Sequence, residues 1–197
     1  MSFERENAEV AVLDWQGPLD LSDFDMPEDP AGYQVPAIYL CVATYDTRIW
    51  IYVGMSRNFL DRFRSHITAT LGLTYGLRND RGEYDYEIKP PPAFFENLAD
   101  PERLAELQRM AAAEVRRQRW FFAEVEPGGL PYAEGLLIRH VRSLAEVGAT
   151  LDGKPVLSDN GNAGRAPMGP LVLENRGADL PCDLLGGEVV WPMEAAA

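Results

Sequence analysis

Residues 36–66 of this chain read PAIYLCVATYDTRIWIYVGMSRNFLDRFRSH, and this stretch decides the expected fold. Residues 37–43 and 48–53 are rich in β-branched and aromatic side chains, which favour strands. The four residues between the two runs are typical of a turn, so the runs predict a short β-hairpin. Each run also contributes one tyrosine, Tyr39 and Tyr52.

The second run leads into a predicted helix that carries two polar side chains on one face. Phe59, Phe63 and Ile67 recur at helical spacing, which predicts a helix from about Phe59. Arg62 and His66 are one turn apart, so their side chains meet at one position on the surface of that helix. A guanidinium binds phosphate through a rigid fork of donors, and an imidazole can exchange a proton near neutral pH. The pair therefore suits an anionic ester substrate.

These residues together resemble the GIY-YIG nuclease superfamily. Residues 37–39 (Ala-Ile-Tyr) and 52–54 (Tyr-Val-Gly) match the two motifs that name the family, with Ala37 in place of the usual glycine. The spacing from Tyr52 to Arg62 and on to His66 also fits the family pattern. The resemblance implies an α+β fold, in which a small domain has a central three-stranded antiparallel sheet flanked by helices.

The family also has a glutamate on a later helix, and Glu134 is the candidate here. Residues 119–125 are strand-like, and Pro131 is well placed in the first turn of a following helix. The carboxylate of Glu134, near the start of that helix, can hold one Mg²⁺ or Mn²⁺ ion, with water and phosphate oxygens as the other ligands of the ion. The family's last element is an asparagine, for which Asn160 is preferred to Asn162, although Asn-Gly is also a common turn dipeptide.

The resemblance implies metal-dependent hydrolysis of phosphodiester bonds. Tyr39 is expected to be the general base, with Tyr52 and His66 orienting it or sharing its proton. Arg62 is expected to bind the scissile phosphate, and Glu134 to hold the metal. The residues expected to contact the substrate in addition are Gly54, Arg57 and Arg64. The alternative is a non-catalytic nucleic-acid- or protein-binding module that retains this fold.

The chain divides by composition into three parts. Residues 1–33 form an acidic N-terminal extension, residues 34–164 the nuclease-like domain with an insertion at about 73–100, and residues 165–197 a C-terminal extension. A chain of 197 residues that is 46% hydrophobic can bury a sizeable core. Within the extensions, the strand-like runs are residues 10–13, 171–173 and 188–191. A helix is predicted after the insertion, over about 101–117.

The net charge of −13 is unusual for a protein that binds a polyanion. The acids crowd the segment before residue 34, whereas arginines recur through residues 48–119, so a basic cleft on an acidic body is possible. Nucleic acid is the expected partner, with DNA favoured over RNA. Cutting both strands of a duplex with one site per chain would favour a homodimer, and an activating protein partner is the other option.

The remaining sequence features bear on location. No apolar run is long enough to cross a membrane, and the first residues lack the basic and apolar regions of a secretory signal. The two cysteines, Cys41 and Cys182, have no zinc-ligand spacing and do not indicate a disulfide framework. A cytoplasmic location without membrane contact is therefore expected.

Overall fold

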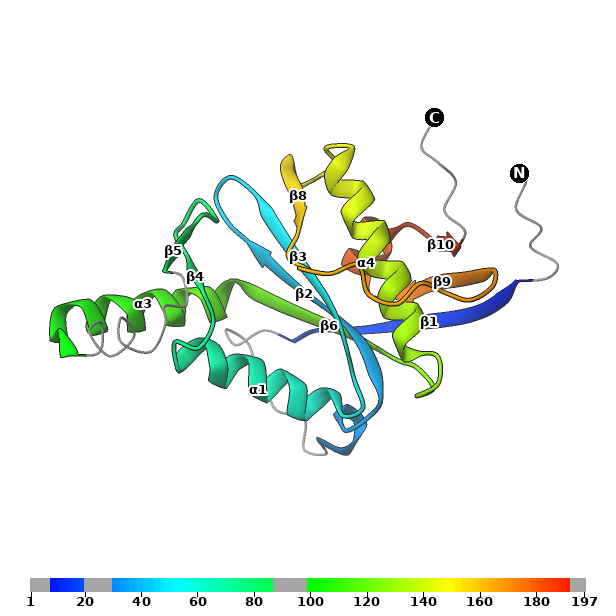
Figure 1. The fold of residues 1–197 in the computed structure, drawn as a ribbon, viewed down its shortest axis with the longest axis horizontal. Helices are drawn as coiled ribbons and strands as arrows, with labels where there is room; N and C mark the ends of the chain where they lie inside the picture. The colour runs from blue at the N-terminus through cyan, green and yellow to red at the C-terminus, as the bar shows by residue number, and fades with distance from the viewer. Residues whose placement is uncertain (1–7, 20–29, 87–98, 192–197) are drawn as a thin grey trace.

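An eight-stranded sheet forms the centre of the computed structural model, which describes residues 8–19, 30–86 and 99–191 (Figure 1). Two of its ladders are parallel, β1 with β9 and β3 with β8, and the others are antiparallel. In spatial order the strands are β10 (Glu188–Trp191), β9 (Leu171–Gly177), β1 (Glu9–Leu19), β6 (Gln118–Glu124), β2 (Ala37–Thr44), β3 (Ile49–Ser56), β8 (Lys154–Ser158) and β7 (Thr150–Leu151).

The expectation of a small domain with a central three-stranded sheet is wrong. Strands β6, β2 and β3 do form an antiparallel ladder, but they are the middle of a mixed eight-stranded sheet. An uncovered β6 would present a row of unpaired backbone N–H and C=O groups, which is unfavourable at a sheet edge. Strand β1 pairs with that edge, and β9 and β10 extend the sheet beyond it. Both extensions of the chain thus contribute strands.

The predicted hairpin is confirmed and its register places the two tyrosines. Strands β2 and β3 pair so that Tyr39 lies opposite Gly54 and Cys41 lies opposite Tyr52. Because side chains alternate between the faces of a strand, both tyrosines project from the same face of the sheet. That face also receives Trp120 from the neighbouring strand β6, which is opposite Cys41.

Helices cover both faces of the sheet (Figure 1). Helix α4 (Leu130–Glu146) packs on one face through an apolar cluster that includes Leu40, Ile51 and Leu137. Helix α1 (Phe59–Leu71) packs on the opposite face, where its Phe59 and Phe63 meet the tyrosine face of the sheet. The third long helix, α3 (Pro101–Arg117), lies beside α1 and matches the predicted range.

Shorter elements complete the described structure. These are a 3-10 helix (Pro30–Tyr33), a two-stranded sheet of β4 (Leu77–Arg78) and β5 (Tyr84–Tyr86), and helix α5 (Asp179–Leu185). The β4–β5 pair comes from the predicted insertion, of which residues 87–98 lie outside the described part of the chain. Much of the acidic extension, residues 1–7 and 20–29, also lies outside it. Within the described ranges, no helix is both long and apolar enough to cross a membrane.

Candidate functional site

Helix α1 positions Arg62 and His66 above the tyrosine face of the sheet. The helix begins after Asn58, whose side-chain oxygen accepts a hydrogen bond from the Asp61 N–H at 3.2 Å and so caps the first turn. Phe59 is buried against the sheet and fixes the rotation of the helix about its axis. That rotation directs Arg62 and His66, one turn apart, toward Tyr39.

Four of the predicted residues meet around the Tyr39 hydroxyl. Arg62 Nε donates a hydrogen bond to this oxygen at 3.0 Å, and His66 Nε2 lies 3.4 Å from it. Tyr52 also interacts with both Tyr39 and Arg62, and the two tyrosine ring centroids are 6.1 Å apart. Residues from β2, β3 and α1, distant in sequence, therefore form one hydrogen-bonded cluster.

Within this cluster Tyr39 is completely buried, and a glycine makes room for it. Its side chain is 0% exposed, whereas Tyr52, Arg62 and His66 are partly exposed and line a common pocket of about 330 Å³. A Cβ atom on Gly54 would lie 2.3 Å from the Tyr39 hydroxyl oxygen, which is an impossible contact. Gly54 is thus required by the Tyr39 ring, in contrast to its expected contact with substrate.

Burial separates the protonation behaviour of the cluster members. Desolvation raises the pKa of Tyr39 well above its ordinary value, and the neighbouring Tyr52 adds to this effect. Burial and then the charge of Arg62 lower the pKa of His66 to about 4. Burial acts to lower the pKa of Arg62, but its interactions with Tyr39 outweigh burial and the pKa rises. At neutral pH the cluster therefore contains a neutral imidazole beside a permanent guanidinium charge.

Glu134 and Asn160 meet along the free edge of β3. Strand β8 pairs with β3 only as far as Ile51. Beyond that point, backbone groups of β3 form hydrogen bonds with side chains instead of with a neighbouring strand. Asn160 Oδ1 accepts from the Val53 N–H at 3.0 Å, and Asn160 Nδ2 donates to the Val53 carbonyl at 2.7 Å. Two residues further along, the Glu134 carboxylate accepts a hydrogen bond from the backbone of Met55.

The environment of Glu134 suits a carboxylate that interacts with Arg62. Glu134 is half-buried near the N-terminal end of α4, and desolvation raises its pKa, while the Met55 backbone and the Arg62 charge oppose that rise. Asn162 does not share this position, since its side chain accepts a hydrogen bond from the Gly164 N–H at 3.1 Å.

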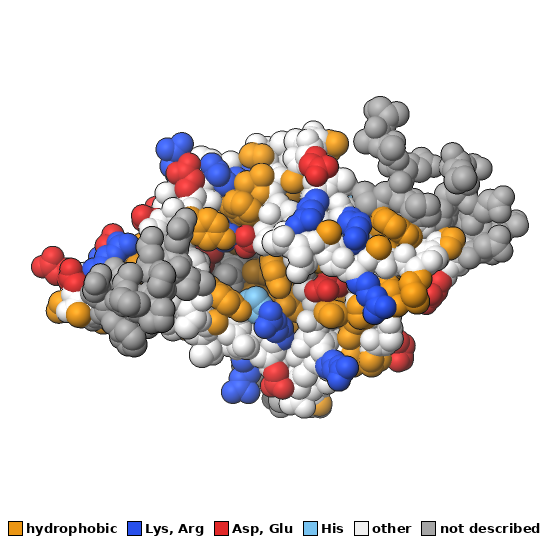
Figure 2. All heavy atoms as spheres, in the orientation of Figure 1, with side chains coloured by type: hydrophobic (Ala, Val, Ile, Leu, Met, Phe, Trp, Pro, Cys, Tyr) orange, Lys and Arg blue, Asp and Glu red, His pale blue; other side chains and the backbone are white. Residues whose placement is uncertain are grey.

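The two remaining predicted substrate contacts lie apart from the cluster. Arg57 and Arg64 are both exposed, and neither lines the pocket. On α1, Arg64 lies two residues from Arg62 and from His66, which places it on another side of the helix. Figure 2 shows Lys and Arg side chains around the middle of one face of the molecule, with acidic side chains interspersed.

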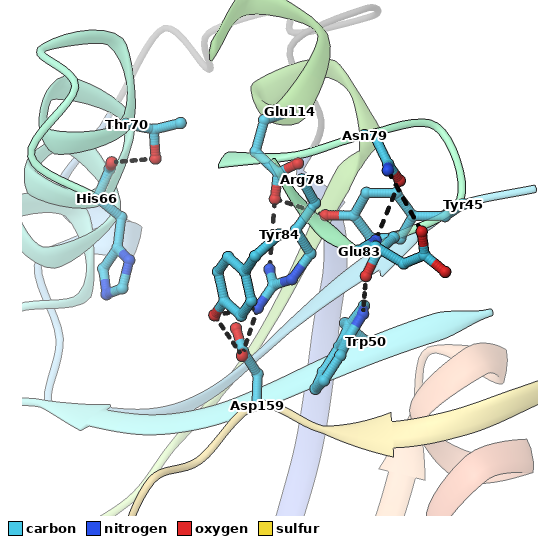
Figure 3. Close-up of polar contacts among 11 residues, drawn as sticks. Tyr45, Trp50, His66, Thr70, Arg78, Asn79, Glu83, Tyr84, Glu114 and Asp159 are labelled. Carbon is cyan, nitrogen blue, oxygen red and sulfur yellow. Dashed lines mark hydrogen bonds and ion pairs between the residues drawn. The ribbon is translucent and has the colours of Figure 1, made fainter. Parts of the chain in front are cut away.

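The pocket extends to a second polar group that sequence reasoning missed. Beyond His66 it is lined by Arg78, Glu114 and Asp159, which come from β4, α3 and the loop after β8 (Figure 3). One signal was available in the sequence, because Glu114 follows Leu107 and Ala111 on the otherwise apolar face of the predicted helix over 101–117. A charged residue on a buried face usually has a buried partner, which here is Arg78.

Glu134 is the residue expected to hold a metal ion at this site. In the described ranges, no group of three or more His, Cys, Asp or Glu side chains is placed to hold a metal ion. A single carboxylate oxygen can still hold a hard divalent cation when water and substrate phosphate oxygens complete the coordination. The donor chemistry of Glu134 therefore fits Mg²⁺ or Mn²⁺ bound jointly with a phosphate.

Comparisons with known proteins leave the family of this chain open. No family model matches it, and neither a curated protein nor a solved structure shows significant similarity. Its function must therefore be inferred from the geometry of the site.

Proposed function

We propose that this protein is an endonuclease that hydrolyses phosphodiester bonds in nucleic acid, with DNA favoured as the substrate. One observation carries the proposal: Tyr52, Arg62 and His66 line one pocket, Arg62 and His66 contact the buried Tyr39 hydroxyl, and Glu134 interacts with Arg62 from the end of the sheet. These are the residue types that phosphate binding, proton transfer and cation binding require. This combination is the one implied by the GIY-YIG resemblance, although it stands on a larger sheet.

Arg62 is the phosphate-binding residue in this proposal. Its Nε donates to the Tyr39 hydroxyl, which anchors the guanidinium, and its side chain lines the pocket, where it also interacts with Tyr52. Tyr39, which accepts the Arg62 hydrogen bond, is a phenol that stays neutral at physiological pH, so it does not cancel the positive charge of Arg62. An anchored guanidinium in a partly desolvated pocket stabilises the charge that grows on phosphate oxygens during hydrolysis.

The geometry favours His66 over Tyr39 as the group that meets the attacking water. Tyr39 has no exposed surface, whereas His66 lines the pocket and is neutral at neutral pH. A bound phosphate anion would oppose the effect of Arg62 and raise the pKa of His66 toward the working pH. Water would then lose its proton to His66 as its oxygen attacks phosphorus, and the bond from phosphorus to the leaving oxygen would break. Tyr39 would position Arg62 and His66.

Glu134 would hold the divalent cation, and Asn160 would fix the strand edge beside it. A bound Mg²⁺ or Mn²⁺ neutralises charge on phosphate and leaving-group oxygens as a Lewis acid. Glu134 is well suited to direct a cation toward the phosphate, because its carboxylate is already oriented by the Met55 backbone. Asn160 pairs with both backbone groups of Val53 and keeps that edge in place.

A non-catalytic binding module is the second candidate. Two observations favour it: the chain carries a net charge of −13, and the described residues contain no group of three or more His, Cys, Asp or Glu side chains placed to hold a metal ion. Such a module would use the Arg62 pocket to bind an anionic group of nucleic acid without breaking a bond. The cleavage assay below separates the two candidates.

Substitution Glu134→Gln tests the nuclease proposal directly. The amide keeps the size of the side chain but loses its negative charge, so cation binding should weaken and metal-dependent cleavage should fall at least about 100-fold. The measurement is cleavage of labelled single-stranded, duplex and branched DNA and RNA, with Mg²⁺ or Mn²⁺ and with a chelator. Exposed Glu146, at the other end of α4, gives the matched control Glu146→Gln, which should retain full activity.

Two results would count against this assignment. Unchanged metal-dependent cleavage in Glu134→Gln would remove Glu134 from the site. Absence of cleavage by the wild-type chain on every substrate, together with retained nucleic-acid binding that Arg62→Ala abolishes, would favour the binding module. A partner-activated enzyme would instead cleave after addition of that partner.

A further inference from the structure

The pocket beside His66 continues to a wall that differs in charge from the Arg62 end. Figure 3 shows His66 on one side of the space and Arg78, Glu114, Tyr84 and Asp159 on the other. Arg78 is only 6% exposed, and its guanidinium lies 4.6 Å from the centre of the Trp50 ring and 4.3 Å from that of Tyr84. We call Arg78, Glu114, Gln118 and Asp159 the far wall.

The far wall has no surplus positive charge to offer a phosphate. Arg78 Nη2 donates to Asp159 Oδ1 at 2.5 Å, and Arg78 Nη1 lies 3.6 Å from Glu114 Oε1. One guanidinium thus faces two carboxylates at the far wall, whereas Arg62 at the other end is hydrogen-bonded to the neutral phenol of Tyr39 and interacts with one carboxylate, that of Glu134. An anion is favoured at Arg62 and disfavoured at the far wall. The pocket therefore suits a ligand that is anionic at one end and rich in N–H donors at the other.

Two acceptor oxygens of the far wall lack a partner in the described structure. Glu114 is 3% exposed, and its Oε1 accepts from the Tyr45 hydroxyl at 2.5 Å, but its Oε2 has no hydrogen-bond partner. The Oε1 atom of Gln118 likewise has none. Arg78 Nε, a donor, also has no hydrogen-bond partner in the described structure. A buried polar group without a partner is unfavourable, so a ligand that supplies the missing partners would be stabilised here. A ligand with adjacent N–H groups would satisfy both acceptor oxygens.

We propose that the far wall binds an unpaired nucleobase that carries an exocyclic amino group, while Arg62 holds the adjoining phosphate. The inference rests on the proposed function, because it assigns the base next to the phosphate of the same substrate. Tyr75 and the exposed Tyr84 provide rings against which a flat base can stack. Adenine, cytosine and guanine each carry an exocyclic amino donor, whereas thymine has none, and its single N3–H lies between two carbonyl oxygens that the far-wall carboxylates repel.

The base must be unpaired because its hydrogen-bonding edge is used by the protein. In a duplex the amino groups of adenine, cytosine and guanine pair with the opposite strand. The favoured substrates are therefore single strands, branch points or a nucleotide rotated out of a duplex. This extends the proposed function from phosphodiester hydrolysis to a substrate class.

Binding of mononucleotides tests the proposal without any need for cleavage. The four 5′-deoxynucleoside monophosphates and inorganic phosphate would be titrated into wild-type protein in the presence of chelator, by calorimetry. We expect dAMP, dCMP and dGMP to bind about tenfold more tightly than TMP, as the gain or loss of one or two hydrogen bonds implies. Equal affinity for the four nucleotides, or for phosphate alone, would overturn the proposal.

Two variants locate the preference in the far wall. Gln118→Leu removes the amide acceptor and should reduce the discrimination against TMP to about threefold or less. Glu114→Gln replaces a carboxylate oxygen with an amide NH₂ donor. It should therefore improve the binding of TMP relative to dAMP, dCMP and dGMP. Glu146→Gln serves again as the distant control and should leave all affinities unchanged. Full discrimination retained by a folded Gln118→Leu protein would also overturn the assignment.

Failure of this inference can be told apart from failure of the proposed function. A base preference in these titrations, without cleavage of any substrate, would support the base-binding wall and count against the nuclease. Metal-dependent cleavage that is lost in Glu134→Gln, without any base preference, would support the nuclease and overturn the base-binding wall.

Discussion

Tyr39 illustrates how a single residue changes its role once its surroundings are known. The motif led us to expect a general base, but the side chain has no exposed surface and lies over Gly54. Its hydroxyl instead joins Arg62 to His66. The chemistry open to the substrate therefore belongs to its partners, which the pocket exposes.

Substitution Gly54→Ala should disturb the site through packing alone. The added Cβ would lie 2.3 Å from both Cζ and the hydroxyl oxygen of Tyr39, so the ring must move away from Arg62. We expect a loss of about 1–3 kcal/mol in the free energy of unfolding and a large loss of cleavage. Urea unfolding and the cleavage assay check these outcomes. Gly128→Ala is the control, since nothing lies within 4 Å of its added Cβ.

His66 should remain neutral until well below neutral pH. Burial and Arg62 lower its pKa to about 4, compared with 6.5 in an unfolded chain. Protons therefore bind the unfolded chain first, so the stability that His66 contributes is complete above pH 6.5 and is lost as the pH falls toward 4. Imidazole resonances followed by NMR should show this midpoint, with His140→Gln used to assign the two histidines.

The same prediction has a thermodynamic test. The difference in unfolding free energy between wild-type protein and His66→Gln should shrink as the pH falls from 6.5 to 4. A His66 midpoint near 6.5, or a difference that does not change over this range, would contradict the buried neutral imidazole.

At the scale of elements, the edge of β3 organises the second half of the site. Strand β8 leaves β3 after Ile51, and the loop that follows sends Asn160 back to Val53. Helix α4 then brings Glu134 to Met55 on the same edge. The site is thus built where a sheet ladder stops, because the freed backbone groups orient side chains.

Asn160→Ala should therefore loosen the β3 edge. It removes two hydrogen bonds to Val53, at 3.0 and 2.7 Å, and leaves both backbone groups without that partner. We expect a loss of about 1–3 kcal/mol in the free energy of unfolding, and faster hydrogen exchange at the Val53 N–H. Asn162→Ala, which removes one exposed turn contact to Gly164, should cost clearly less. Equal losses in the two variants would contradict this role for Asn160.

At the scale of the whole molecule, both ends of the chain are part of one sheet. Leu13 and Trp15 of β1 are buried in the same apolar cluster as α4, and Trp15 Nε1 donates to Asn175 Oδ1 of β9 at 2.9 Å. This buried pair joins segments 160 residues apart in the sequence. The core that supports α4, and with it Glu134, therefore includes the two extensions.

The fragment of residues 34–164 should consequently fail to fold stably. It lacks β1, β9 and β10, which would expose the edge of β6 and part of the apolar face under α4. We expect a non-cooperative urea transition or aggregation, compared with a cooperative transition for the full chain. A cooperative, monomeric fragment would contradict this prediction.

Substitutions within β1 provide the matched comparison. Trp15→Ala removes a side chain that is 2% exposed and should cost about 3–5 kcal/mol. Val12→Ala lies on the same strand with its side chain 43% exposed and should cost much less.

Local sequence patterns determined the β2–β3 hairpin, helices α1, α3 and α4, and the candidate residues on them, because spacing and capping act over a few residues. Only the tertiary structure decided how large the sheet is. Strand β1 pairs with β9 between residues 162 positions apart, such as Glu9 and Leu171, and no local pattern encodes such a parallel pairing. The tertiary structure also buried Tyr39, exposed His66 and brought Arg78, Glu114 and Asp159 into the same pocket. Desolvation and contact between distant segments arise only when the chain is packed, so these properties follow from the fold as a whole.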